Sequence, residues 1–445
     1  MGVKMLARGL AVNAARKMMD VANVEPAYVK ALLRKPGPVN GGPKTRRMPW
    51  PRRRHFDHQE RRAVMDLMTR EMRRGGAIVY GGAEEKAYCQ EFAAYLGGGF
   101  ADAVNSGTNA VYLALRALDL EPGTEVVVPP ITDAGGTMPV AMLNCIPVPA
   151  DSMPGSLNSS VEQIRAVLTE RTSAIVVAHI AGHPVDMDPI MALAAERGIP
   201  VVEDCAQALG ATYKGRMAST LGTVSAFSTM FGKQHCTGAQ GGVVYTHDTL
   251  IYARIRQAAD RGKPHGAIGS PSNLVASLNF NQDEISMAIG RVQLAKLPAN
   301  VARRRRFAGS VAQGMAGIRG VSLVPEPAGC RSSPWFLVLL LGDSVRCDSA
   351  QFAAALTAEG VDGVWPGYSF HPTDWPWHQD AVVYGASRLP WSLAGAVPRR
   401  FELPNAHAAN KRVVRVEVHE NLGEVEAADM VRAVGKLAAF FREPR

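Results

Sequence analysis

The sequence lacks an uninterrupted apolar run long enough to span a bilayer, and its first residues carry neither a secretory signal nor the Ser or Thr of a myristoylation signal. It also lacks paired cysteines. The six that it has are scattered without metal-ligand spacing, so we expect reduced thiols. These absences exclude a membrane-spanning protein and a disulfide-stapled secreted domain, and they predict a soluble, cytoplasmic protein.

The formal charge of +9 is confined to one end of the chain. Residues 1–62 hold fifteen Lys and Arg against four Asp and Glu, which leaves the remainder close to neutral. The stretch Lys4–Lys35 mixes apolar and basic residues at helical spacing and ends before Pro36-Gly37-Pro38. We expect a surface helix that packs on the body or on a partner subunit, rather than a membrane or nucleic-acid contact.

The 445 residues are too many for one ordinary domain. We expect a basic helical extension and linker over 1–45, a large cofactor-binding domain over 46–297 and a small α+β domain over 298–445. In the large domain, apolar β-rich runs alternate with helical patterns, which predicts an α/β fold with a mostly parallel sheet. These runs include residues 126–129, 174–178, 200–203 and 242–245.

Helices are predicted over 57–74 and 84–96, before the first strands. In the small domain we expect a charged helix over 300–307 and strands over 335–341 and 413–418. The four arginines at 303–306 are interpreted as a solvated helix face rather than as an anion site.

Lys233 closes the run Phe227–Lys233, which follows the acidic strand end Val201–Ala208. A lysine that forms a Schiff base with an aldehyde cofactor needs an anion to keep a pyridine nitrogen protonated and donors to hold a phosphate. Asp204, expected at the carboxyl end of a parallel strand, supplies the anion, and Ser228 supplies a hydroxyl. The pattern predicts a pyridoxal 5'-phosphate site with Lys233 as its catalytic residue.

Ser106-Gly107-Thr108 opens a predicted helix over 109–118. The free backbone N–H groups of a helix N-terminus favour a phosphate. Alone, Ser-Gly-Thr is a common helix cap. Its place upstream of the Asp204 and Lys233 segments is what makes it a candidate phosphate site.

The order of these motifs resembles that of the DegT/DnrJ/EryC1/StrS family of sugar and cyclitol aminotransferases. Further matching segments are Gly41-Gly42-Pro43 with Trp50-Pro51, Pro122–Val126, Asp186–Asp188, and Ala288–Gly290 with Gln293-Leu294. The resemblance runs from about Gly41 to the C-terminus. It implies fold type I of the pyridoxal phosphate enzymes, the aspartate aminotransferase-like fold.

The resemblance also implies roles for single residues. Gln207 would lie against the cofactor ring, and Asn279 would reach the phosphate of a neighbouring subunit, so that a homodimer shares its active sites. Asp133, a candidate cofactor-binding residue, stands where the family has an aromatic residue that stacks on the ring, which puts stacking in doubt. Contact with a polar substrate or a basic neighbour and a structural role in a turn are the alternatives. Gln240 and Asn281 depart from the family pattern as well. These departures suggest an atypical substrate.

Histidines and tryptophans outside these motifs leave alternatives open. His179 and His183 are interpreted as structural rather than pocket-lining, and metal binding is not expected. The cluster of His371, Trp375, Trp377 and His378 is either a part of the substrate mouth or a satellite hydrophobic cluster.

The sequence therefore predicts a ping-pong aminotransferase. It would move an amino group from L-glutamate or L-glutamine to a keto sugar linked to a nucleotide or to a keto cyclitol, in secondary metabolite (antibiotic) or glycan biosynthesis. The alternatives are a dehydratase or lyase on the same scaffold and a non-catalytic, cofactor-binding regulator. Lys233 argues against the first, because the dehydratase branch has histidine there.

Overall fold

The computed structural model describes residues 42–265, 272–368, 370–395 and 399–442. The helices predicted over Lys4–Lys35 lie outside the described residues. In the part that is described, no helix combines the length and apolar character needed to cross a membrane. All six cysteines lie in the described part as free thiols.

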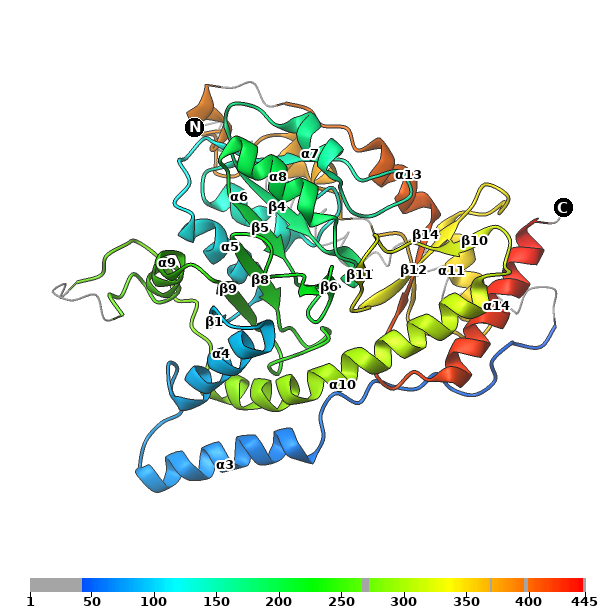
Figure 1. Ribbon diagram of the computed structural model, residues 1–445, viewed down its shortest axis with the longest axis horizontal. Helices are drawn as coiled ribbons and strands as arrows, with labels where there is room; N and C mark the ends of the chain where they lie inside the picture. Colours follow the sequence, from blue (N-terminus) through cyan, green and yellow to red (C-terminus); the bar gives the residue numbers. More distant parts are fainter. Residues whose placement is uncertain (1–41, 266–271, 369, 396–398, 443–445) are drawn as a thin grey trace, which may run out of the picture.

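A seven-stranded sheet forms the centre of the larger lobe (Figure 1), in the order β1-β9-β8-β5-β4-β2-β3. The strands between β3 and β8 pair in parallel, whereas β9 is antiparallel to both of its neighbours. This is the mostly parallel sheet that was predicted. The bounds are Phe100–Val104 (β1), Glu125–Val128 (β2), Ile146–Pro149 (β3), Thr172–Ala178 (β4), Val201–Asp204 (β5), Val224–Ser228 (β8) and Gly242–Thr246 (β9).

Helices cover both faces of this sheet. Successive side chains of a strand point to opposite faces, and both sets are apolar here, so both faces need to be buried. Val126, Val176 and Val202 pack with α5 (Gly107–Ala117) and α9 (Thr249–Ala259). The alternate residues Val127, Ile175 and Val201 pack with α7 (Val161–Val167) and α8 (Met187–Arg197). The sheet is therefore buried on both faces.

The smaller lobe contains an antiparallel sheet, β10-β12-β14-β13, with α11 and α14 in its core. Helix α10 (Glu284–Met315) runs from the larger lobe into this core (Figure 1). We propose that the two sheets mark two domains, and the expected boundary at 297/298 falls inside α10. The bounds are Val321–Leu323 (β10), Phe336–Leu341 (β12), Val364–Pro366 (β13), Val413–Glu417 (β14), Ser349–Ala358 (α11) and Glu424–Arg442 (α14).

The remaining elements lie outside the two main sheets. Helix α3 (His58–Arg74) begins after Asp57, whose side chain forms a capping box with Glu60. A three-stranded sheet, β11-β6-β7, joins the two lobes through β11. The other bounds are Ala83–Leu96 (α4), Met138–Met142 (α6), Pro376–Gln379 (α12), Pro404–Arg412 (α13), Ala134–Gly136 (η2), Ile180–Gly182 (η3), Pro372–Asp374 (η4), Trp391–Ala394 (η5), Thr212–Tyr213 (β6), Arg216–Met217 (β7) and Cys330–Arg331 (β11).

The interpretation of residues 303–306 as a solvated helix face is wrong for Arg304. Arg303 and Arg306 are exposed, but Arg304 is fully buried. It lies on the core face of α10 because it is spaced three residues from both Val301 and Phe307. Its guanidinium group donates to Glu420 at 3.0 Å and to two backbone carbonyls of the smaller lobe.

The buried pair makes folding stability depend on pH. Burial alone would raise the pKa of Glu420, but the Arg304 and Arg53 guanidinium groups lower this pKa to about 2. The stabilisation is thus complete above the ordinary glutamate pKa and is lost as the pH falls towards 2.

We expect Glu420→Gln to lower the free energy of unfolding at pH 7 by about 3 kcal/mol, because it removes this charge from the buried Arg304 and the partly buried Arg53. Denaturant titrations between pH 7 and 2 should show the gap to wild type closing at low pH. Glu424→Gln, at an exposed carboxylate of the same lobe, is the control. Parallel acid dependence of wild type and Glu420→Gln would contradict the assignment.

Candidate functional site

Lys233 lies in the loop that joins β8 to β9, and its side chain is buried. Its Nζ atom lies 3.6 Å from the ring centre of Trp335. Burial lowers the pKa of Lys233 to about 8, although the carboxylates of Asp204 and Asp133 act in the opposite direction. Near that pH a large fraction of the amine is neutral, and a neutral amine serves as a nucleophile or a base.

Asp204 is the last residue of β5, at the carboxyl edge of the parallel strands. It is buried, and burial raises its pKa, whereas a hydrogen bond from the Ala206 N–H (3.0 Å to Oδ1) and the charge of Lys233 lower it. Its other oxygen lies near Gly136, where an added Cβ would be 2.4 Å from Thr132 Oγ1 and 3.1 Å from Asp204 Oδ2. Only glycine therefore allows this turn to pack so closely beside the carboxylate.

The N-terminus of α5 lies against the end of β8. Ser106 caps this helix by accepting from the Asn109 N–H at 3.1 Å. A Cβ added to Gly107 would lie 2.6 Å from the Cβ of Ser228, so only glycine allows this approach. The free N–H groups of Gly107 and Thr108 and the hydroxyl of Ser228 therefore converge on one small region, which suits an anion.

Gln207 is held between the two lobes. Its Oε1 accepts from the Ala181 N–H at 2.8 Å, and its Nε2 donates to the hydroxyl of Tyr368 at 2.8 Å. Gln207 and Tyr368 are both buried. Both polar ends of the amide are thus engaged, which fixes the plane of the side chain.

Asp133 and Asn279 are both exposed. Asp133 caps η2 by accepting from the Gly135 N–H at 3.2 Å, and its charge raises the pKa values of Asp204 and Lys233, so it belongs to the same site. Asn279 is different, because its oxygen accepts two hydrogen bonds from Asn281 and its segment bridges to Asp260. Within the described subunit it is not brought to Lys233.

Sequence reasoning missed three residues of this site. Trp335 contacts the Lys233 amine, Tyr368 holds Gln207, and Arg53 donates to the backbone carbonyl of Lys233 at 2.7 Å. Arg53 is the second residue after the Trp50-Pro51 motif, in a segment whose sequence indicates only a high basic charge. No linear pattern links Trp335 or Tyr368 to Lys233.

The surroundings of His179 are structural, as predicted from the sequence. His179 is buried between the carboxylate of Glu203 (3.0 Å) and the Val185 N–H (3.1 Å). Trp377 packs against a small cluster that contains Trp391 and Ala381, and the ring of His378 lies edge-on to Trp391. This packing favours the satellite hydrophobic cluster over the substrate mouth for His378, whereas Trp377 also lines a cavity together with Thr108.

The residues present fit pyridoxal phosphate. A buried amine at Lys233, a buried carboxylate at Asp204 and an anion-binding helix end at Gly107 lie along one edge of the sheet. The buried Asp204 carboxylate suits a protonated ring nitrogen, and the N–H groups of Gly107 and Thr108, held close to the Ser228 hydroxyl, suit a phosphate.

Comparison with known proteins gives the same result. The sequence model of the DegT/DnrJ/EryC1/StrS aminotransferase family matches residues 59–435. An L-glutamine:2-deoxy-scyllo-inosose aminotransferase from Streptomyces lividus is 32% identical over 90% of this chain and 96% of its own length. A dTDP-3-amino-3,4,6-trideoxy-alpha-D-glucose transaminase from Streptomyces venezuelae is 30% identical over 86% of this chain and 94% of its own.

Solved structures agree on the fold. An aminotransferase from Psychrobacter cryohalolentis superposes with a TM-score of 0.78 at 28% identity, over 89% of this chain and 100% of that one. The Streptomyces venezuelae protein DesV superposes with a TM-score of 0.74 at 28% identity, over 87% and 99% of the two chains. The fold predicted from the sequence is confirmed.

We expect Gly107→Ala to weaken binding of inorganic phosphate about tenfold, because the new methyl group must push α5 away from Ser228. Calorimetric titration of the cofactor-free protein measures the change. Gly309→Ala is the matched control, since its methyl group meets open space in α10. Equal phosphate affinity in the two variants would argue against a phosphate site at this helix end.

Proposed function

The chain belongs to the DegT/DnrJ/EryC1/StrS aminotransferase family, and from this premise we propose that it moves an amino group from L-glutamate or L-glutamine to a ketone. It is a pyridoxal phosphate-dependent aminotransferase. The proposed acceptor is a nucleotide-linked keto sugar or a keto cyclitol, and the proposed setting is secondary metabolite or glycan biosynthesis. The observation that carries the proposal is the convergence of Lys233, Asp204 and the N-terminus of α5 on one sheet edge.

Bound pyridoxal phosphate supplies an electron sink for the carbon that loses its hydrogen. Side chains and backbone groups of the protein would bind the cofactor and transfer the proton. The Lys233 amine would hold the cofactor and would also carry a proton to and from the reacting carbon. The Asp204 carboxylate would keep the pyridine nitrogen protonated, and the N–H groups of Gly107 and Thr108, with the Ser228 hydroxyl, would hold the phosphate. Gln207 would lie against the ring.

Asp133 has a substrate-directed role in this proposal. Its carboxylate is exposed yet close enough to Lys233 and Asp204 to raise their pKa values. An exposed carboxylate accepts hydrogen bonds from the hydroxyl groups that sugars and cyclitols carry. We therefore propose that Asp133 contacts the acceptor instead of stacking on the cofactor.

Transfer of labelled nitrogen tests the proposal directly. The protein is incubated with L-glutamine or L-glutamate labelled with ¹⁵N at the α-amino group and with either a nucleotide-linked keto sugar or a keto inositol. Mass spectrometry should find ¹⁵N in one acceptor class. Release of water or of a cleaved product without nitrogen transfer would instead indicate a lyase.

We expect Lys233→Ala to lower the turnover number by at least about 10²-fold, because no other described residue supplies a buried amine at this edge. Steady-state kinetics of the labelled transfer measure the loss. Lys214→Ala, at an exposed lysine that pairs with Asp188, should leave turnover unchanged. Comparable activity of Lys233→Ala and Lys214→Ala would remove the catalytic role.

The chain also forms a homodimer with shared sites in this proposal. A cavity of about 410 Å³ adjoins the phosphate region and has a largely apolar lining: Thr108, Asn109, Tyr112, Met138, Pro139, Ala141, Met142, Leu278, Phe280, Trp377 and Val383. Leu278 is 68% exposed and Met142 53% exposed. A second copy placed here would cover these side chains and bring Asn279, next to Leu278, towards the partner's phosphate.

We expect Leu278→Asp to raise the dimer dissociation constant at least about tenfold, because it places a charge in the apolar contact. Sedimentation velocity over a range of concentrations measures this constant, and activity should fall with the dimer fraction. Val425→Asp, at an equally exposed residue of α14, is the control. A monomeric wild type with full activity would contradict the shared site.

A further inference from the structure

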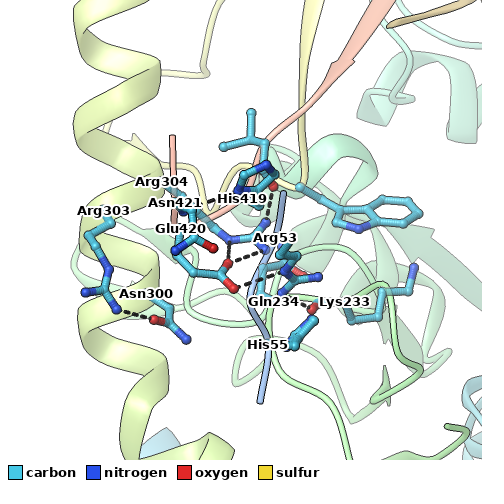
Figure 2. A network of polar contacts seen from close by, with 12 residues as sticks. Arg53, His55, Lys233, Gln234, Asn300, Arg303, Arg304, His419, Glu420 and Asn421 are labelled. Carbon is cyan, nitrogen blue, oxygen red and sulfur yellow. Dashed lines mark hydrogen bonds and ion pairs between the residues drawn. The ribbon is translucent and has the colours of Figure 1, made fainter. Parts of the chain in front are cut away.

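The turn that carries Lys233 is fixed through its main chain. Arg53 donates from Nη2 to the carbonyl of Lys233 at 2.7 Å (Figure 2). It also donates from Nη1 to the carbonyl of Gly232 at 3.1 Å. The indole N–H of Trp335 donates to the same Gly232 carbonyl at 2.9 Å. Trp335 thus holds the turn through its N–H group while its ring contacts the Lys233 amine.

Arg53 is itself anchored to the smaller lobe. Its Nε atom donates to Glu420 Oε1 at 3.0 Å, and the other oxygen of Glu420 accepts from Arg304 Nη2 at 3.0 Å. The Arg304 side chain is fully buried, and that of Glu420 is 5% exposed. One guanidinium group therefore uses three of its donors to tie the lysine turn to a buried ion pair.

The segment around Arg53 is held on both sides. The Pro51 carbonyl lies 3.0 Å from His419 Nε2, and the Arg54 N–H donates to Asn421 at 2.8 Å. Residues 42–57 cross the smaller lobe and then reach α3 in the larger one (Figure 1). The smaller lobe thus touches the lysine turn through Arg53.

We propose that Arg53 is a positioning residue for Lys233. This role rests on the proposed function of Lys233. Arg53 acts through the main chain, since the charges that shift the Lys233 pKa are those of Asp204, at the end of β5, and Asp133, before η2. By fixing two successive carbonyls, Arg53 keeps the side chain in the dry space beside Trp335, where burial favours the neutral amine.

Attachment of the cofactor provides a readout other than catalysis. The full-length protein is freed of cofactor and mixed with pyridoxal phosphate between pH 6 and 10. Samples are quenched with borohydride, and the modified Lys233 peptide is quantified by mass spectrometry. The attachment rate follows the fraction of neutral amine, so its midpoint in pH reports the Lys233 pKa.

We expect Arg53→Ala to move this midpoint upward from about 8, towards that of an ordinary lysine, because the freed turn lets water reach the amine. Each unit of increase lowers the attachment rate at pH 7 about tenfold. The pH midpoint of Arg53→Lys should lie between those of wild type and Arg53→Ala, since one ammonium group cannot reach both carbonyls and Glu420. If the alanine variant does not fold, the midpoint of the lysine variant tests the proposal.

Arg54→Ala is the matched control, because this neighbouring arginine is exposed and its contact with Asn421 uses only the backbone. The pH dependence of cofactor attachment in Arg54→Ala should match that of wild type. If the folded Arg53 variants also show the wild-type pH dependence, Arg53 does not position the lysine. A wild type whose Lys233 is never modified would instead overturn the proposed function itself.

Discussion

The burial of the Lys233 amine is the constraint on which the rest of the site depends. A charged amine is costly in a dry environment, so burial lowers its pKa to about 8. The same environment raises the pKa of Asp204, and each group offsets part of the cost of the other. The site thus combines a partly neutral amine at Lys233 with a carboxylate at Asp204. The first serves as a reactive lysine, and the second keeps a pyridine ring protonated.

The fold satisfies this constraint with elements that are far apart in the sequence. The parallel sheet brings the ends of β5 and β8 to one edge. Helix α5 points its N-terminus at that edge and approaches Ser228 closely because position 107 has no side chain. The smaller lobe closes the other side with Trp335 and Tyr368, so the dry space exists only when both lobes are folded.

Much of this could be predicted from the sequence, because the informative patterns are local. Alternating apolar runs predict the sheet, and Asp204, Ser228 and Lys233 lie within short motifs at strand ends. The polar network around Glu420 could not be predicted, since Arg53 and Glu420 are 367 positions apart. The burial of Arg304 overturned a local charge pattern for the same reason, as only the folded chain supplies its partner. The contact of Asn279 with the phosphate of a neighbouring subunit stays a prediction, because it involves a second subunit.

The absorption spectrum of the cofactor-loaded protein, recorded before and after addition of L-glutamate or L-glutamine, tests the central claim most directly. We expect a visible band from cofactor bound through Lys233, which one of the donors converts to the near-ultraviolet band of pyridoxamine phosphate. A protein that shows no visible band with pyridoxal phosphate, or a band that neither donor changes, would contradict that claim.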